Sequence, residues 1–134
     1  MRWFLDTNAC IHHLRGRPPL LSQRWQMHRA TDIALPLTTY AELLVGAEKS
    51  NQRERVLREI ERLLEAHEIV EITEDVAETY ARIRADLERR GELIGGNDLW
   101  IAATALAHGA TLVTNNTAEF SRIANLHLED WTLP

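Results

Sequence analysis

Short apolar segments alternate with longer amphipathic segments along this chain. Residues 2–5, 33–35, 69–72 and 111–113 are apolar runs with the length of buried strands, and a terminal strand is expected near residues 126–128. The stretches between them repeat apolar residues at helical spacing. The clearest is 51–67, where one face is formed by Val56, Leu57, Ile60, Leu63 and Leu64.

Turn and cap residues divide the remaining chain into helices. The pattern predicts helices over 7–15, 19–29, 38–49, 51–67, 73–90 and 97–108, with a short helix after the fourth strand. Pro36 is expected to stop the second strand, Thr38 or Thr39 to cap the third helix, and Gly109 to end the sixth. Strands that alternate with helices predict an α/β fold, a single domain over residues 1–134 whose mostly parallel central sheet has helices on both faces.

Composition narrows the class of protein. A chain of 134 residues with 45% hydrophobic residues fits one soluble domain, and no run approaches the roughly 20 apolar residues of a membrane span. Asp6 interrupts the N-terminal apolar run too early for a signal peptide. The single Cys10 excludes an internal disulfide, so we expect a reducing, cytoplasmic location. A nucleophilic thiol beside His12 or His13 is the alternative to a buried packing residue.

The net charge gives only a weak indication of the ligand. The net charge of −5 argues against nucleic-acid binding, because phosphate contacts need cations. Acids that bind metal ions would reduce that negative balance. Of the 15 basic residues only Lys49 is not arginine, and arginine pairs with phosphate oxygens in a planar fork.

Two polar segments directly follow predicted strands. Asp6 follows the first strand, and Thr114-Asn115-Asn116 follows the fourth. In a parallel sheet both lie at the carboxyl ends of the strands, where open α/β folds bind their ligands. Taken alone, Asp6 could equally be an ordinary helix cap.

Two further acids occupy unusual helical positions. Asp98 shares a helix face with apolar Ile101 and Ala102, so it is expected to face protein, unless it is a first-turn acid behind an Asn97 cap. Glu42 has mainly small or apolar helical neighbours, although a surface position is an equal alternative. A cluster of three acids repels itself unless a hard cation with oxygen ligands, such as Mg²⁺, binds there.

Four segments, in order, resemble the conserved blocks of PIN-domain nucleases, and most closely those of VapC-type toxin ribonucleases. They are Leu5-Asp6-Thr7-Asn8, Thr39-Tyr-Ala-Glu42-Leu-Leu-Val-Gly46, Asn97-Asp98-Leu-Trp-Ile-Ala-Ala103 and Leu112-Val-Thr-Asn-Asn-Thr-Ala-Glu-Phe120. The resemblance covers nearly the whole chain.

The resemblance implies a catalytic site of Asp6, Glu42, Asp98 and Asn116 in a Mg²⁺-dependent endoribonuclease, with Mn²⁺ as a substitute. Asp6 and Asp98 would hold metal directly or through water, and Glu42 would be a further ligand or orient the attacking water. The fourth position is acidic in many relatives but is Asn116 here, so a second metal ion is in doubt. Glu119 could supply the missing charge.

The resemblance also implies partners: an RNA substrate, often tRNA, a cognate VapB-like antitoxin and a second copy in a homodimer. Apolar positions that could form an antitoxin groove or simply belong to the core are Leu14, Leu20, Leu43 and Leu44. The main alternative function is a degenerate PIN fold retained as a binding or scaffold module.

Other phosphate chemistries fit less well. A phosphoryl-transfer domain with an aspartate nucleophile requires a second acid two residues after Asp6, but that position is Asn8. A receiver domain requires a lysine after a late strand, and the only lysine is Lys49. Nucleotide binding is disfavoured because the sequence has no glycine-rich phosphate loop. The histidines His12, His13 and His108 are expected to be packing or surface residues.

Overall fold

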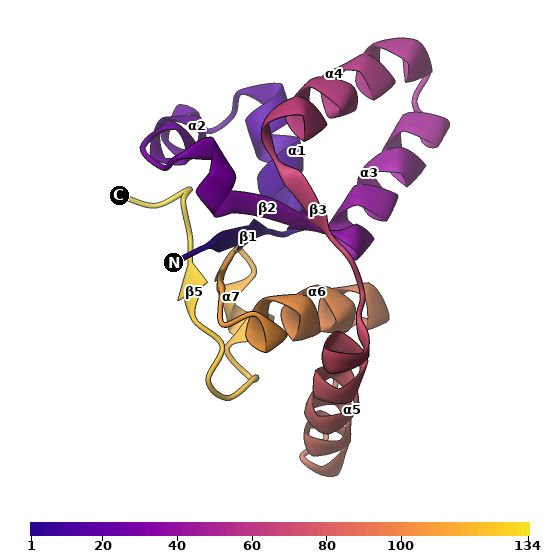
Figure 1. Ribbon diagram of the computed structural model, residues 1–134, viewed down its shortest axis with the longest axis vertical. Helices are drawn as coiled ribbons and strands as arrows, with labels where there is room; N and C mark the ends of the chain where they lie inside the picture. The colour runs from indigo at the N-terminus through magenta and orange to yellow at the C-terminus, as the bar shows by residue number, and fades with distance from the viewer.

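A five-stranded sheet forms the centre of the molecule in a computed structural model that describes residues 1–134 (Figure 1). Every pair of neighbouring strands is parallel, and their order across the sheet is β3-β2-β1-β4-β5. The strands are β1 (Trp3–Leu5), β2 (Ile33–Pro36), β3 (Glu68–Val70), β4 (Thr111–Val113) and β5 (Leu128–Glu129). The predicted α/β class is therefore confirmed.

Seven α-helices connect the strands and cover both faces of the sheet, as predicted (Figure 1). Their bounds are α1 (Thr7–Arg15), α2 (Pro19–Gln26), α3 (Leu37–Lys49), α4 (Arg53–Ala66), α5 (Glu74–Arg89), α6 (Gly96–Ala107) and α7 (Thr117–Phe120). A short 3₁₀ turn, η1 (Ala30–Asp32), precedes β2. None of these helices is both long enough and apolar enough to cross a membrane.

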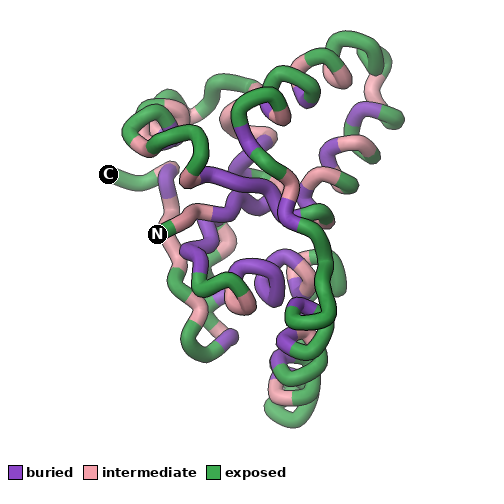
Figure 2. Tube along the Cα trace, in the orientation of Figure 1, coloured by how far each residue is buried: buried purple, intermediate pink, exposed green.

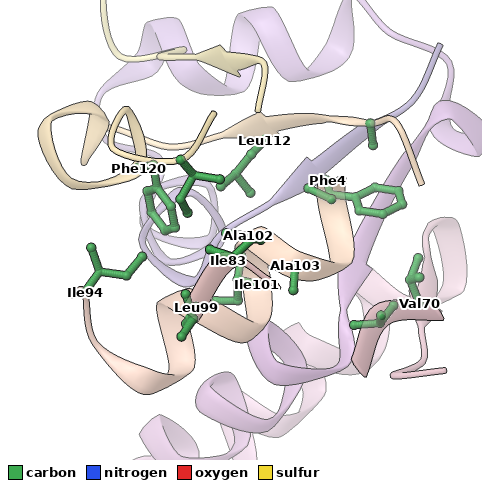
Figure 3. Close-up of a cluster of buried hydrophobic side chains, with 14 of the residues drawn as sticks. Phe4, Val70, Ile83, Ile94, Leu99, Ile101, Ala102, Ala103, Leu112 and Phe120 are labelled. Atoms are coloured by element: carbon green, nitrogen blue, oxygen red, sulfur yellow. The ribbon is translucent and has the colours of Figure 1, made fainter. Parts of the chain in front are cut away.

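The sheet separates two buried apolar clusters, because successive strand residues point to opposite faces. Phe4 and Leu112 pack with α5, α6 and Phe120 on one side, as Figure 3 shows. Leu5 and Val113 pack on the other side with residues of α1, α2, α3 and α4. The outward sides of α4 and α5 stay exposed (Figure 2), which matches their charged faces in the sequence.

The order of the strands reverses at β1. The chain adds β2 and β3 on one side of β1, and then places β4 and β5 on the other. The backbone N–H of Asp6 donates to the carbonyl of Val113 at 3.1 Å, so the carboxyl ends of β1 and β4 are joined. This switch point is where an open α/β sheet leaves room for a ligand.

The start of α3 differs from the prediction. Strand β2 includes Pro36, which also occupies the N-cap position of α3, so neither Thr38 nor Thr39 caps the helix. The buried hydroxyl of Thr39 instead donates to the carbonyl of Leu5 at 2.9 Å. A threonine expected to cap the start of a helix therefore ties α3 to the end of β1.

Several other boundaries move by one to three residues. Helix α2 ends at Gln26 rather than 29, α4 begins at Arg53 rather than 51, and α6 begins at Gly96 rather than 97. Strand β3 spans Glu68–Val70 instead of 69–72, and β5 spans Leu128–Glu129 instead of 126–128. The bounds of these two strands follow from their pairing with neighbouring strands: Ala34 pairs with Glu68, and Leu112 pairs with Leu128. Gly109, in the left-handed region at φ 63°, follows α6 as predicted.

Candidate active site

Asp6 lies at the sheet's switch point and is 4% exposed. It caps α1, accepting a hydrogen bond from the Ala9 N–H at 2.8 Å, so the cap and site interpretations are both compatible with its position. Burial raises the pKa of this carboxyl to about 6, and the charges of Asp98 and Glu42 add to the rise. Hydrogen bonds from Thr114 and Ala9 lower it only in part.

Asp98 stands in the first turn of α6, where Gly95 rather than Asn97 occupies the N-cap position. The residue is half-buried and its carboxylate makes no hydrogen bond or ion pair within the chain. Burial makes the largest contribution to the raised pKa of Asp98, and the charges of Glu42 and Glu119 raise this pKa further. The Asn97 cap of the alternative is therefore wrong, and Asp98 lies half toward the protein and half toward solvent.

Glu42, on α3, receives hydrogen bonds from two neighbouring elements. The Thr7 hydroxyl donates to one carboxylate oxygen, and the Asn97 side-chain amide donates to the other at 3.3 Å. The side chain is half-buried, which disagrees with the plain surface alternative. Glu42 is thus fixed between the first turns of α1 and α6.

Asn116 and Glu119 complete the cluster from the segment after β4. The Asn116 amide donates to the Glu119 carboxylate at 3.2 Å, and both residues are half-buried. Asn116 is the N-cap residue of α7, but its side chain makes no cap hydrogen bond. Because Glu119 acts on the pKa of Asp98, its charge reaches the site that Asn116 borders.

The sequence did not assign supporting roles to Thr7, Asn97 and Thr114, although it placed Thr114 in the polar segment after the fourth strand. Each lies next to Asp6, Asp98 or Asn115 in the sequence, and this adjacency was the available signal. Their roles depend on hydrogen bonds between elements. Such contacts could not be derived from spacing along the chain.

The donor set suits a hard divalent cation. No three acid, histidine or cysteine side chains approach closely enough to surround an ion by themselves. Mg²⁺ is commonly held by one or two carboxylates and retains several waters, so a wide, oxygen-rich site fits it. The two desolvated carboxyls with raised pKa values, Asp6 and Asp98, are the residues that would gain most from a positive charge.

Cys10 and the histidines do not form a nucleophilic site. Burial raises the pKa of the Cys10 thiol well above its usual range, so the thiol stays protonated and the nucleophile alternative is wrong. His13 stacks on Trp25 with ring centroids 3.9 Å apart, and His108 meets Phe4 edge-on. These two are packing or surface residues, as predicted.

Comparison with known proteins decides the family. The model of the PIN domain family matches residues 3–126. The chain is 38% identical over 133 residues to ribonuclease VapC1 of Haemophilus influenzae strain R2866, covering 98% of this chain and 99% of that protein. This chain belongs to the PIN-domain family of VapC ribonucleases.

Two further PIN-domain relatives agree over the same length. The tRNA(fMet)-specific endonuclease VapC of Shigella flexneri is 35% identical over 132 residues, covering 98% of this chain and 99% of that protein. In the crystal structure of VapBC2 from Rickettsia felis bound to a promoter DNA fragment, one chain superposes with a TM-score of 0.91 at 37% identity. That match covers 98% of this chain and 99% of the other. The expected class, a PIN-domain nuclease, is therefore confirmed.

Proposed function

We propose that this protein is a Mg²⁺-dependent endoribonuclease that hydrolyses structured RNA, most often tRNA, as the toxin of a VapBC-type pair. The observation that carries the proposal is that the Asp6, Glu42 and Asp98 carboxylates lie near enough at the switch point of the sheet to act on one another's charge. A tRNA substrate rests on the relative from Shigella flexneri, whose name states tRNA(fMet) specificity.

Each residue has a distinct role in the proposed site. A divalent cation bound there would neutralise the carboxylates and stabilise the charge that builds on the phosphate during hydrolysis. Asp6 and Asp98 would hold the ion, directly or through water. Glu42, fixed by Thr7 and Asn97, would be a further ligand of the ion or would orient the attacking water. Asn116 would hold a metal-bound water or a phosphate oxygen. The Asp6 cap on α1 keeps its carboxylate in a single orientation.

The proposed partner is a small antitoxin protein. Its support is that several similar solved chains come from toxin–antitoxin complexes, including the one from Rickettsia felis. Of the four leucines expected to form its groove, Leu14 and Leu43 line a hollow of about 530 Å³ between α1, α3 and α4. Leu20 and Leu44 do not line it, and Leu44 packs against the core cluster, as the core alternative expects.

Cleavage of purified tRNA tests the proposal. The protein should cut with Mg²⁺ or Mn²⁺ and not in EDTA, and Asp6→Asn or Asp98→Asn should abolish cutting. Asp75→Asn, at an exposed acid on α5, is the matched control and should cut normally. Undiminished cleavage in EDTA, or by either site variant, would contradict the metal mechanism. Binding of tRNA without cleavage under any divalent ion would favour the scaffold alternative.

A further inference from the structure

Two arginines flank the C-terminal end of α1 and line two neighbouring hollows. Arg15 is the last residue of α1, and Gly16, in the left-handed region at φ 69°, turns the chain before Arg17. Both arginines line the 530 Å³ hollow that also contains Glu42. Both also line a second hollow of about 640 Å³ with His12, Pro18 and Pro19.

These arginines are free of partners within the chain. Eight ion pairs join other arginines to acids on the surface, but neither Arg15 nor Arg17 takes part in one. Arg55, on α4, lines the first hollow and is also unpaired. A guanidinium group with no partner keeps all its N–H donors for a ligand, and its planar fork matches phosphate oxygens.

We propose that Arg15, Arg17 and Arg55 bind the phosphate backbone of the RNA on one side of the acidic centre. This inference rests on the proposed ribonuclease function. Arg15 lies about 12 Å along α1 from Thr7, at about 1.5 Å per residue, and Thr7 contacts Glu42. The phosphates of a bound strand extend past this distance, so the arginines contact phosphates away from the scissile bond.

The lining of the second hollow favours RNA over a protein ligand. No carboxylate lines it, and two of its five lining residues are the arginines, so its charge suits a polyanion. A chain of net charge −5 with acids at its reaction centre repels a polyanion. The unpaired arginines beside the acidic centre offset this repulsion for a bound RNA strand.

The test measures RNA binding without cleavage. A labelled single-stranded oligouridylate is titrated in EDTA at several salt concentrations with wild-type protein and the double variant Arg15→Gln/Arg17→Gln. We expect weaker binding and a salt slope (log of the association constant against log of the salt concentration) shallower by about 1.4, or about 0.7 for each lost phosphate contact. Arg55→Gln, on a different helix, should reduce the slope by about 0.7. The Arg55→Gln variant therefore tests the proposal independently if the double variant does not fold.

Arg58→Gln is the matched control, because Arg58 is exposed on α4, unpaired and outside both hollows. Its salt slope should equal that of the wild type. Slopes that are unchanged in the folded arginine variants would overturn the inference, even if the wild type cuts RNA. If the arginine variants bind RNA normally but lose a protein that co-purifies with the wild type, the inference is also overturned, and the arginines bind a protein instead. If the wild type binds with the expected slope but never cuts, the proposed function fails and the inference stands.

Discussion

A single carboxylate, Asp6, both caps a helix and carries the strongest electrostatic penalty in the site. The cap hydrogen bond from Ala9 favours the ionised form, yet burial outweighs it and the pKa rises to about 6. Folding of the metal-free protein therefore leaves an unfavourable charge at neutral pH. The Asp6 side chain therefore stabilises the fold through its cap hydrogen bond, while the burial of its charge destabilises the fold. Carboxyls with strongly raised pKa values are common at functional sites.

We predict that Asp6→Asn stabilises the metal-free protein at pH 7. The native pKa of about 6 lies above the usual value of 3.8, so Asp6 stabilises the fold below about pH 4 and loses that contribution as pH rises through about 6. The loss at pH 7 is about 3 kcal/mol, at about 1.4 kcal/mol per pKa unit. Asparagine cannot ionise and still caps α1.

Urea unfolding in EDTA at pH 7 and pH 4 measures this difference. The advantage of Asp6→Asn should be largest at pH 7 and should nearly vanish at pH 4. Asp75→Asn, at an exposed acid, should show no such dependence on pH. A variant less stable than the wild type at pH 7 would contradict the assigned burial penalty.

Asn116 offers a second prediction at the residue scale. Its amide borders the site and donates to Glu119, whose charge acts on Asp98. If Asn116 occupies the fourth acidic position, Asn116→Asp should tighten Mg²⁺ or Mn²⁺ binding, and Glu119→Gln should weaken it only modestly. Isothermal titration with Mn²⁺ checks both variants. An inactive Glu119→Gln beside an active Asn116→Ala would assign the fourth position to Glu119 instead.

Among the elements, those with strong internal periodicity were predicted best. Helix α1 and strand β4 have the bounds that the sequence predicts, because caps and apolar runs are local properties. The start of α3 was predicted wrongly since the Thr39 hydroxyl binds the carbonyl of Leu5, 34 residues away in sequence. A contact over that distance overrides the local preference of threonine for a cap.

The packing of α1, α2 and the end of α4 depends on neutral histidines. His13 stacks on Trp25, whose indole N–H donates to His67 Nε2 at 3.1 Å, so that ring nitrogen must be unprotonated. The other ring nitrogen of His67 bonds to the carbonyl of Ala30 at 3.0 Å. Burial, with a smaller contribution from His67, lowers the pKa of His13 below its usual 6.5.

We predict that His13 makes the fold sensitive to acid. The unfolded chain binds a proton at His13 near pH 6.5 and the folded chain binds it at a lower pH, so stability falls as pH drops below about 6.5. His13→Gln should reduce the difference in unfolding free energy between pH 7 and pH 5.5. His127→Gln, at an exposed histidine, is the control and should leave it unchanged. An unchanged difference in His13→Gln would show that other groups cause the acid sensitivity.

Across the complete fold, the sequence placed the candidate site residues near one another better than it predicted the contacts between them. Asp6 and the Thr114 segment could be placed together because parallel strands end at one edge, and the observed order puts β1 beside β4. The hydrogen bonds that fix Glu42 could not be predicted, because they depend on the separation of α1, α3 and α6. Homodimer formation stays a prediction, which light scattering of the purified protein would check.

Toxicity in the cell would follow from cleavage of tRNA. If the protein is a VapBC-type toxin, its expression alone should arrest growth, because cleaved tRNA stops translation, and Asp98→Asn should remove the toxicity. Co-expression with the small open reading frame beside its gene should restore growth, since a partner that covers the 530 Å³ hollow also covers Glu42 at its edge. Asp75→Asn should remain toxic. Unharmed growth with the wild-type protein, together with no partner on purification from its own host, would contradict the toxin assignment, whereas tRNA cleavage in vitro would still support the nuclease.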